Sequence, residues 1–461
     1  MDTSAVPAHG PAAPFPRTET DSRGAGLFAA YGVSVLIVAT VFAAIDRQIL
    51  VLLAEPMRAS LGLSDTKLGL LQGVAITLFS GLAAVPIGWL ADRYGRRSLL
   101  AISVLVWAAA TAACGLAPDF QWLFLAAVGL GIGEAGLAPI IYGLIPDIVP
   151  ERHRALANGI YALAAILGTG LGLALSGSLI PALDGLRPLL SAGMQGLESW
   201  RLAFLAVAVP GPLVALAVLL IRVRRPEEST ATGPTAALPA ASVGSYLRSQ
   251  THTALAVFGG AGLAALGLAA VGNWVPVIAA RSFGVSAAEA GQGIGGAYLL
   301  GTLAGAAAGA VAVKRLRSRV GMATPVRVIA LGMVIAALAS VLLLFTDSVV
   351  QIYLLFGIQV AALIAGSVLA PTLLQDMTPA ALRSRVIAVG SVASVGLAAL
   401  SPVLVGLMSD ALQPAPRGLL IAVALVCAAA MGLGAALLRS AETAFVRTVT
   451  TFHPELNRSQ A

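Results

Sequence analysis

The segment Leu27–Ala54 reads LFAAYGVSVLIVATVFAAIDRQILVLLA and is apolar over most of its length. About 20 such residues are enough for a helix to cross a bilayer. The segment nevertheless contains Asp46 and Arg47 side by side, and a second apolar segment, Phe120–Ile145, contains Glu134. A charge at the bilayer centre costs at least about 2.5–3.5 kcal/mol, so these side chains are expected to face protein or water and to handle a proton, an ion or a charged substrate. The pattern indicates a membrane transporter.

Composition indicates the same class. Of the 461 residues, 58% are hydrophobic and 11% are charged, and the mean hydropathy is +0.92. A soluble domain is about 25% charged, so the chain is expected to be an integral membrane protein. Its net charge of +7 reflects the loops and does not predict a nucleic-acid partner. The two cysteines lie in different apolar segments and do not indicate a disulfide framework.

Twelve apolar stretches are long enough to be transmembrane helices. They are Leu27–Ala54, Leu68–Ala91, Leu99–Ala117, Phe120–Ile145, Ala155–Leu179, Trp200–Ile221, Thr253–Ala280, Ala290–Val313, Val326–Phe345, Val349–Leu374, Ala381–Met408 and Gly418–Leu438. The predicted fold is an all-α membrane protein with twelve transmembrane helices.

The polar stretches between the spans divide the chain. The longest, residues 222–250, is rich in Pro, Ala, Ser and Thr and is interpreted as a linker. The predicted organisation is a disordered cytoplasmic arm (1–26), an N-terminal six-helix bundle (27–221), a cytoplasmic linker (222–250), a C-terminal six-helix bundle (251–438) and a cytoplasmic tail (439–461). The first 26 residues lack the apolar core of a cleavable signal.

Basic residues predict the orientation. The connections after even-numbered spans, with the first residues of the spans that follow them, carry Arg93, Arg96, Arg97, Arg152, Arg154, Arg222, Arg224, Arg225, Arg248, Lys314, Arg315, Arg317, Arg319, Arg327, Arg383 and Arg385. The connections after odd-numbered spans, counted in the same way, carry only Arg58, Lys67, Arg187, Arg201, Arg281 and Arg417. Because cytoplasmic loops are enriched in Lys and Arg, both termini and the linker are expected to lie in the cytoplasm. The protein itself is expected to be a multi-pass protein of the inner (plasma) membrane.

An internal repeat relates the two sets of six spans. Leu137-Ala138-Pro139 in span four matches Leu369-Ala370-Pro371 in span ten, and Arg152-x-Arg154 after span four matches Arg383-x-Arg385 after span ten. Matches in the same order and at a nearly constant offset predict two pseudo-symmetric bundles.

The charged residues of the spans are not repeated. The offsets place Asp46 opposite Leu268, Arg47 opposite Ala269, and Glu134 opposite Gly366. A cavity between the halves would therefore be charged on one wall and apolar on the other, which suits an amphipathic solute better than a sugar.

The stretch Gly88–Arg97, GWLADRYGRR, resembles the signature loop of the major facilitator superfamily. More closely, the chain resembles the Spinster branch of lysolipid and sphingosine-1-phosphate transporters, as a bacterial member. The strings that carry this resemblance are Asp46-Arg47-Gln48, Gly62–Gly73 (GLSDTKLGLLQG), Gly131–Pro139 (GIGEAGLAP) and Pro150–Gly168 (PERHRALANGIYALAAILG). They cover the N-terminal half, whereas the C-terminal half matches only as general architecture.

One residue departs from that branch, whose members usually carry an arginine seven residues before the span-four glutamate. Here that residue is Ala127, either a natural divergence or an engineered replacement. Seven residues are two helical turns, so Ala127 is expected on the same face as Glu134, roughly 10.5 Å away. Without the arginine, two acids share one base, and a carboxylate with fewer cationic neighbours protonates more easily.

The resemblance and the chemistry together assign roles to the core charges. Asp46 and Glu134 are predicted to couple transport to protons, because burial and access to a base shift the protonation of a carboxylate. The alternative is a structural bridge between helices. Arg47 is predicted to alternate between a carboxylate and the phosphate of a substrate, both of which suit arginine. The alternative is a permanent partner of Glu134.

Other residues are assigned to gating and to substrate binding. The resemblance implies that Asp92, Arg93, Arg96 and Arg97, with Arg152 and Arg154 in the next cytoplasmic loop, latch the halves together when the site faces outward. Asp92 would then meet the positive amino end of span eleven, and the arginines would pair with acids such as Asp147. Alternatively, the arginines only set topology.

Tyr142, Asn158 and Tyr161 are predicted cavity groups that contact the substrate together with Arg47 and Glu134. Trp200 and Trp274 are expected to be anchors at the membrane interface.

The predicted function is proton-coupled transport of an anionic amphipathic lipid by alternating access, with a drug or organic-anion transporter as the alternative. The predicted partners are a lysolipid or similar amphipath, protons and membrane lipids, and a monomer is expected. No histidine lies within a span and no GxxxxGK[ST] loop occurs, so neither an enzyme nor an ATP-driven pump is expected, and no cofactor or metal is predicted.

Overall fold

The computed structural model describes residues 19–223, 243–379, 382–415 and 417–452. Within these residues all regular structure is helical, and twelve helical segments are long and apolar enough to cross a membrane. Each predicted span overlaps one of these segments, which confirms the predicted fold class.

The N-terminal half contains the eleven helices α1–α11, the π-helix η1 and the short 3-10 helix η2. The spans are α1 (Glu19–Leu52); α3 (Asp65–Gly69), η1 (Leu70–Leu78) and α4 (Phe79–Tyr94) in series; α5 (Arg96–Leu116); α6 (Phe120–Ala135) with α7 (Leu137–Ile148); α8 (Glu151–Leu186); and α10 (Ser199–Ala208) with α11 (Gly211–Leu219). The connections contain α2 (Ala54–Leu61), η2 (Arg187–Leu189) and α9 (Ala192–Gln195).

The C-terminal half has the same number of spans. They are α13 (Thr251–Phe283); α14 (Ala287–Val320); α15 (Thr324–Leu342) with η4 (Leu343–Phe345); α16 (Val349–Ser367) with α17 (Ala370–Met377); α18 (Arg383–Ala411); and α19 (Gly418–Ser440). The remaining elements are α12 (Val243–Ser249), η3 (Gly321–Ala323) and α20 (Glu442–Phe452).

Three of the segments predicted to lie outside the bundles contain helix in the structure. Helix α1 begins at Glu19, so residues 19–26 of the arm predicted to be disordered are helical, whereas residues 1–18 lie outside the described residues. The predicted linker and tail contain α12 and α20, and residues 224–242 and 453–461 of them lie outside the described residues. The apolar side chains of α20, Phe445 and Val449, are buried against the C-terminal half, which explains why the chain stays helical beyond the last span.

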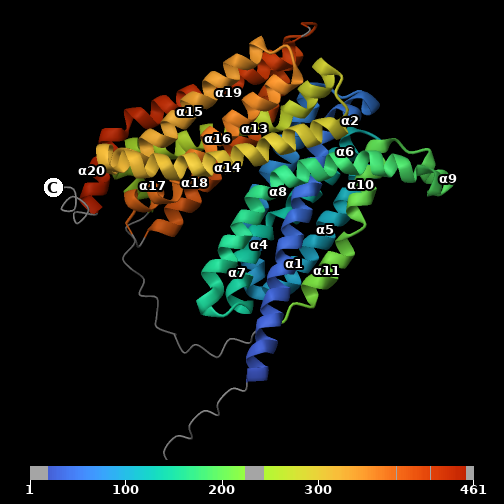
Figure 1. Ribbon diagram of the computed structural model, residues 1–461, viewed down its shortest axis with the longest axis horizontal. Coiled ribbons are helices and arrows are strands. Elements are labelled where there is room, and N and C mark those ends of the chain that lie inside the picture. The colour runs from blue at the N-terminus through green and yellow to red at the C-terminus, as the bar shows by residue number, and fades with distance from the viewer. Residues whose placement is uncertain (1–18, 224–242, 380–381, 416, 453–461) are drawn as a thin grey trace, which may run out of the picture.

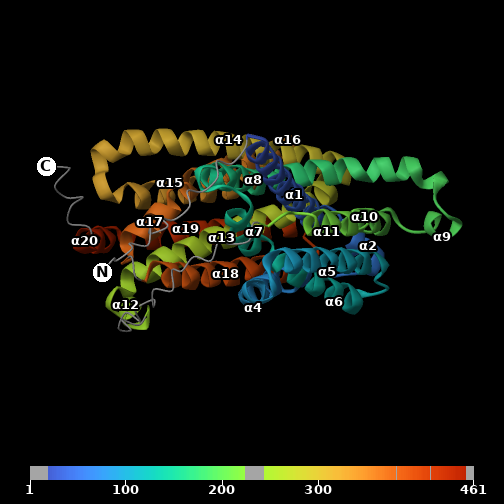
Figure 2. The same ribbon diagram turned by 90° about the horizontal axis from the view of Figure 1, so that it is seen from below.

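The two halves are arranged as a V. In Figure 1 the blue-to-green half extends downward, the yellow-to-red half extends to the left, and they meet at the upper right; Figure 2 shows the same two groups from below. The halves pack through α8 against α14 and through α3 and η1 against α18. We call the end near Asp65 and Arg281 the joined end, and the end near Asp92 and Asp147 the separated end.

Glycines permit the close contact of the halves. A Cβ on Gly291 of α14 would lie 2.8 Å from the Cα of Gly177 on α8, and one on Gly73 of η1 would overlap the Ala399 carbonyl oxygen of α18. Small residues allow helix backbones to approach in this way in membranes. The glycines of α14 at residues 301, 305 and 309 instead face α16 within their own half.

Spans four and ten are each interrupted at the same place in the repeat. Proline has no N–H, so Pro139 leaves the carbonyl of Ala135 without its helical donor, and Pro371 does the same to Ser367. Helix α6 ends at Ala135 and helix α16 ends at Ser367. The matching prolines therefore produce matching breaks, as two related halves require.

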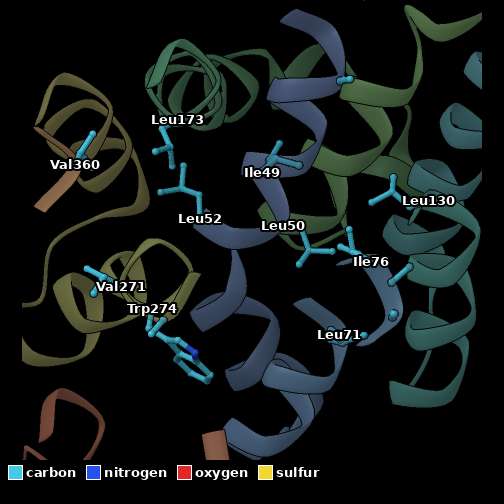
Figure 3. Close-up of a cluster of buried hydrophobic side chains, with 14 of the residues drawn as sticks. Ile49, Leu50, Leu52, Leu71, Ile76, Leu130, Leu173, Val271, Trp274 and Val360 are labelled. Atoms are coloured by element: carbon cyan, nitrogen blue, oxygen red, sulfur yellow. The ribbon is translucent and has the colours of Figure 1, made fainter. Parts of the chain in front are cut away.

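The prediction that Trp200 and Trp274 anchor the membrane interface is wrong. Trp274 is fully buried and Trp200 is 2% exposed. Figure 3 shows Trp274 and Val271 of α13 near Leu52 of α1, where the halves meet. Trp200 packs edge-on against Phe204 and donates a 2.7 Å hydrogen bond from Nε1 to Glu198. Both rings are buried in protein because partners from neighbouring segments cover them.

Candidate functional site

The centre of the candidate site is an ion pair between spans one and four. Arg47 on α1 donates to Oε2 of Glu134 on α6 from Nε at 3.1 Å and from Nη2 at 2.8 Å. The Arg47 side chain is 50% exposed, whereas that of Glu134 is 4% exposed. Oε1 of Glu134 is buried and accepts no hydrogen bond from the described residues. One end of the pair is therefore accessible to a solute and the other is enclosed.

Asp46, the neighbour of Arg47, points into the protein and is 0% exposed. Its Oδ2 accepts a 2.7 Å hydrogen bond from the hydroxyl of Thr111 on α5, and its Oδ1 has no partner among the described residues. The sequence did not single out Thr111, because an isolated threonine in an apolar span is common and gives no signal of its own.

The three charges do not balance. Arg47 is bonded to Glu134, so an ionised Asp46 would be a buried carboxylate held by one neutral hydroxyl. An uncompensated buried charge is costly, and taking up a proton is the usual remedy. One proton on Asp46 would make the group of three neutral. The arrangement can therefore bind a proton and, at the exposed face of Arg47, an anion.

Ala127 lies two turns from Glu134 on α6 and is fully buried. The place where the resembled branch carries an arginine is thus inside the N-terminal half. An arginine there would need enclosed acidic partners, and Asp46 and Glu134 are the acids buried in this bundle near span four.

The structure brings together two of the three predicted cavity groups. The rings of Tyr142 on α7 and Tyr161 on α8 meet edge-on with centroids 4.9 Å apart; Tyr142 is 48% exposed and Tyr161 is buried. Asn158 lies one turn before Tyr161, and its Oδ1 is buried without a partner in the described chain. Tyr142 lies eight residues beyond Glu134, roughly 12 Å along the span towards the separated end.

The predicted gating residues lie at the separated end and interact within the N-terminal half. Arg96 bonds Asp92 at 2.8 Å and Asp147 at 3.1 Å. Arg97 donates to the carbonyl of Ile221 at the end of span six. Arg93 lies over the rings of Trp89 and Tyr94. Arg152 donates to His153, and Arg154 to the carbonyls of Val149 and Pro146.

Ionic contacts between the halves occur at the joined end, and the sequence did not predict them. Arg281, at the end of span seven, donates to both oxygens of Asp65 at 2.9 and 2.8 Å and to Glu55 at 2.8 Å. The Asp65 side chain is 1% exposed. Arg58 also bonds Glu55, at 2.7 Å. A bidentate arginine on an enclosed carboxylate is among the stronger ion-pair geometries.

A second acid crosses the halves at the same end. Asp410, near the end of α18, accepts hydrogen bonds from the backbone N–H groups of Asp65 (3.1 Å) and Thr66 (2.9 Å) and from the Thr66 hydroxyl (2.6 Å). These N–H groups begin span two, where a helix carries partial positive charge. The Ser409 hydroxyl donates to Asp65 at 2.6 Å. The string GLSDT contained part of this arrangement, but its partners lie more than 200 residues away.

Comparison with known proteins identifies the class. The Major Facilitator Superfamily matches residues 36–402, which is most of the chain. The chain belongs to this superfamily, and it is a multi-pass secondary transporter rather than an enzyme.

More specific similarities are mixed. A solved bacterial homolog of the human lysosomal transporter Spinster, in an inward-facing and unoccupied conformation, superposes with a TM-score of 0.74 at 24% identity over 92% of this chain and 98% of that one, which shows a shared fold. A probable L-galactonate transporter of Escherichia coli (strain K12) is 30% identical over 42% of this chain and 40% of its own length. A sphingosine-1-phosphate transporter (SPNS2) of Mus musculus is 37% identical over 24% of this chain and 20% of its own length. The chain thus aligns with less than half the length of these two relatives.

Proposed function

We propose that this protein is a proton-coupled transporter of an anionic amphipath of the lysophospholipid or sphingosine-1-phosphate kind. The observation that carries the proposal is the division of the Arg47–Glu134 pair into an exposed cation and a buried acid, with the buried Asp46 beside it. Proton binding to Glu134, the carboxylate that is bonded to Arg47, weakens the contact between the two side chains. The guanidinium is then free to bind the phosphate of a substrate, which it suits as well as it suits a carboxylate.

An apolar pocket in the opposite half supports an amphipathic substrate. It encloses about 240 Å³ between spans seven, nine, ten and twelve, and its lining includes Leu268, Met333, Leu363 and Gly366. An apolar cavity on the order of 150 Å³ already stays dry and binds a hydrocarbon such as benzene. Leu268 and Gly366 stand opposite Asp46 and Glu134 in the repeat, so the halves offer an ionic group and an alkyl pocket at corresponding places.

The pocket and Arg47 lie on the same side of the contact between the halves. In Figure 3 the interface side chains include Leu52 of α1 and Val271 of α13. Arg47 precedes Leu52 on α1, and Leu268 precedes Val271 on α13. Both α1 and α13 run towards the joined end, so the cation and the pocket both lie towards the separated end. A head group on Arg47 and a chain in the pocket would bridge the two halves.

Transport of a small organic anion is the second candidate. Arg47 would bind a carboxylate as readily as a phosphate, and relatives named as L-galactonate and tartrate transporters match parts of the chain. Such a substrate would leave the alkyl pocket unused. The length of the substrate's apolar chain therefore discriminates between the two candidates.

Alternating access under this proposal uses the two ends in turn. The separated end carries the arginine-rich connections, so it is assigned to the cytoplasm. The conformation would then be open inward, with Arg281 and Asp410 closing the outer end. In the opposite conformation these contacts break, and Asp92 approaches the first turn of span eleven.

Uptake into proteoliposomes under an imposed pH gradient tests the proposal. Lysophospholipids of increasing chain length are expected to be transported, with little inhibition by tartrate or L-galactonate. Glu134→Gln should reduce the pH-driven component at least tenfold, whereas Glu151→Gln, a matched change at an exposed glutamate in the first turn of α8, should not. Equal pH-driven uptake by both variants would remove Glu134 from the mechanism.

The chain-length preference tests the pocket separately. Ala264→Leu adds bulk to the pocket lining and should move the preferred chain to a shorter length. Gly432→Leu is the control, because a Cβ at that glycine meets nothing within 4 Å. Transport of organic anions but not of lysolipids would instead establish the second candidate.

A further inference from the structure

Thr111 on span three has a single hydroxyl hydrogen and two acceptors within reach. Its Oγ1 lies 2.7 Å from Oδ2 of Asp46 and 3.0 Å from the carbonyl oxygen of Trp107. Thr111 is fully buried. A hydroxyl donates one hydrogen bond and can accept others. The hydrogen therefore points to one of the two oxygens at a time.

The protonation of Asp46 decides which oxygen receives it. When Asp46 is ionised, the hydroxyl of Thr111 donates to Oδ2. When Asp46 is protonated on Oδ2, its own O–H donates to Oγ1 of Thr111, and the Thr111 hydrogen turns to the Trp107 carbonyl. Both arrangements use the same positions of the heavy atoms. The site can therefore accept or release one proton by rotation of a single hydroxyl.

We propose that Thr111 is a positioning residue that sets the pH at which Asp46 exchanges its proton. The inference deepens the proposed function, in which Asp46 is a proton site. A hydrogen bond to an ionised group is roughly twice as strong as one between neutral groups. The Thr111 hydroxyl thus favours the ionised carboxylate, and its removal should keep Asp46 protonated up to a higher pH.

Other groups around Asp46 act through charge. They are Arg47 on α1 and Glu134 on α6. The Cys114 thiol on α5 is a further titratable group near Asp46. Helix α8, which also packs against α1, contributes the uncharged Ser176 hydroxyl, bonded to the Ile45 carbonyl. The charges of α7 and α10 are engaged towards the ends of the molecule, where Asp147 binds Arg96 and Arg201 binds the Ala117 carbonyl. Thr111 differs from all of these because it touches the carboxyl itself.

Infrared titration of the protein in lipid bilayers tests the role directly. The band of the protonated Asp46 carboxyl is assigned by its loss in Asp46→Asn and followed with pH. Thr111→Val keeps the shape and removes the hydroxyl, and it should raise the midpoint by about half to one pH unit. Thr111→Ser restores the hydroxyl and should keep the wild-type midpoint. Thr302→Val is the matched control, a buried threonine in the other half whose hydroxyl has no partner among the described residues.

The outcomes separate this inference from the proposed function. An unchanged midpoint in Thr111→Val, or an equal shift in Thr111→Ser, would overturn the role of the hydroxyl. A shifted midpoint with transport that ignores pH would uphold Thr111 and overturn proton coupling instead. Should Thr111→Val fail to fold, the midpoint of Thr111→Ala against that of Thr111→Ser decides in the same way.

Discussion

The two ends of the molecule hold the same kind of helix pair in different ways. Spans two and eleven run antiparallel, so each end presents the start of one helix and the end of the other. At the joined end Asp410, near the end of α18, binds the first N–H groups of span two. At the separated end Asp92, near the end of α4, binds Arg96 of its own half.

The comparison explains what distinguishes the ends chemically. A carboxylate beside a helix start can satisfy free N–H groups and the positive end of the helix dipole. Asp410 makes this contact across the two halves. At the same end, Arg281 forms an ion pair with the buried carboxylate of Asp65. Asp92 is placed to make the equivalent contact but is 68% exposed and bonded locally. The contact between an acid and the start of a helix is thus made at the joined end, whereas at the separated end Asp92 is bonded to Arg96 instead.

Breaking the Arg281 contacts should have the largest effect. Arg281→Gln leaves Asp65 buried without its cation, which typically costs about 3–5 kcal/mol. The joined conformation should lose on the order of 100-fold or more in relative population. Pulsed electron paramagnetic resonance between labels at Gly196 and Asp347, two exposed loop residues of the opposite halves at the joined end, measures this as a longer distance. Arg281→Lys, which keeps the charge, should lengthen it much less; an unchanged distance in Arg281→Gln would show that this ion pair does not hold the end closed.

Removing the charge of Asp410 should have a smaller effect in the same direction. Asp410→Asn keeps the size but weakens the contacts to the N–H groups of Asp65 and Thr66, a loss of about 1–2 kcal/mol by analogy with helix caps. The same pair of labels should report a roughly tenfold shift towards the opened end. A distance distribution identical to that of the wild type would contradict the role assigned to Asp410.

Removing the charge of Asp92 should have a smaller effect, and it should disfavour the conformation that is closed at the separated end. Asp92→Asn removes only a surface ion pair in the present conformation, and such pairs contribute about 0–1 kcal/mol. The conformation in which Asp92 reaches span eleven should become a few-fold rarer. Labels at the separated end, at His153 and Arg319, would then show fewer short distances when the protein is driven to close there. More short distances in the variant would rule out a latch at Asp92.

The hydrogen bond between Ser60 and Glu198 lies within the N-terminal half at the joined end, so it should affect the stability of the fold and not the opening of that end. Ser60 donates a 2.6 Å hydrogen bond to Glu198, and this bond is the main reason why the pKa of Glu198 is lowered from 4.5. A lowered pKa contributes stability that is present above the unfolded value and is lost as the pH falls through the folded one. Ser60→Ala should therefore slightly reduce the melting temperature at pH 7, and the difference from the wild type should vanish in the acidic range below the lowered pKa. A lengthened distance between the Gly196 and Asp347 labels would show that this pair takes part in gating.

Hydropathy predicted most of the fold. Apolar runs fixed the twelve spans, because a membrane leaves helices of this length few alternatives. The repeat that contains Pro139 and Pro371 corresponds in the structure to a break at the same place in spans four and ten. Hydropathy did not distinguish a tryptophan at the lipid head groups from one between helices, so the locations predicted for the side chains of Trp200 and Trp274 were wrong.

The site was predictable in part. Asp46, Arg47 and Glu134 stood out because charge is rare in a span, and the structure joins Arg47 to Glu134 at 2.8 Å. Arg281 and Asp410 lie at span ends, where charges are ordinary, and their partners follow only from how the halves meet. Thr111 carries no charge and gains meaning only from its distance to Asp46.

Distances at both ends, measured as the pH changes, test the central claim most directly. The claim is that protons on Asp46 and Glu134 govern which end is joined. In lipid nanodiscs, the Gly196–Asp347 pair and the His153–Arg319 pair should change in opposite senses across the pH range in the otherwise unaltered protein. Asp46→Asn combined with Glu134→Gln should abolish that response. A pH response that survives both substitutions would contradict the account.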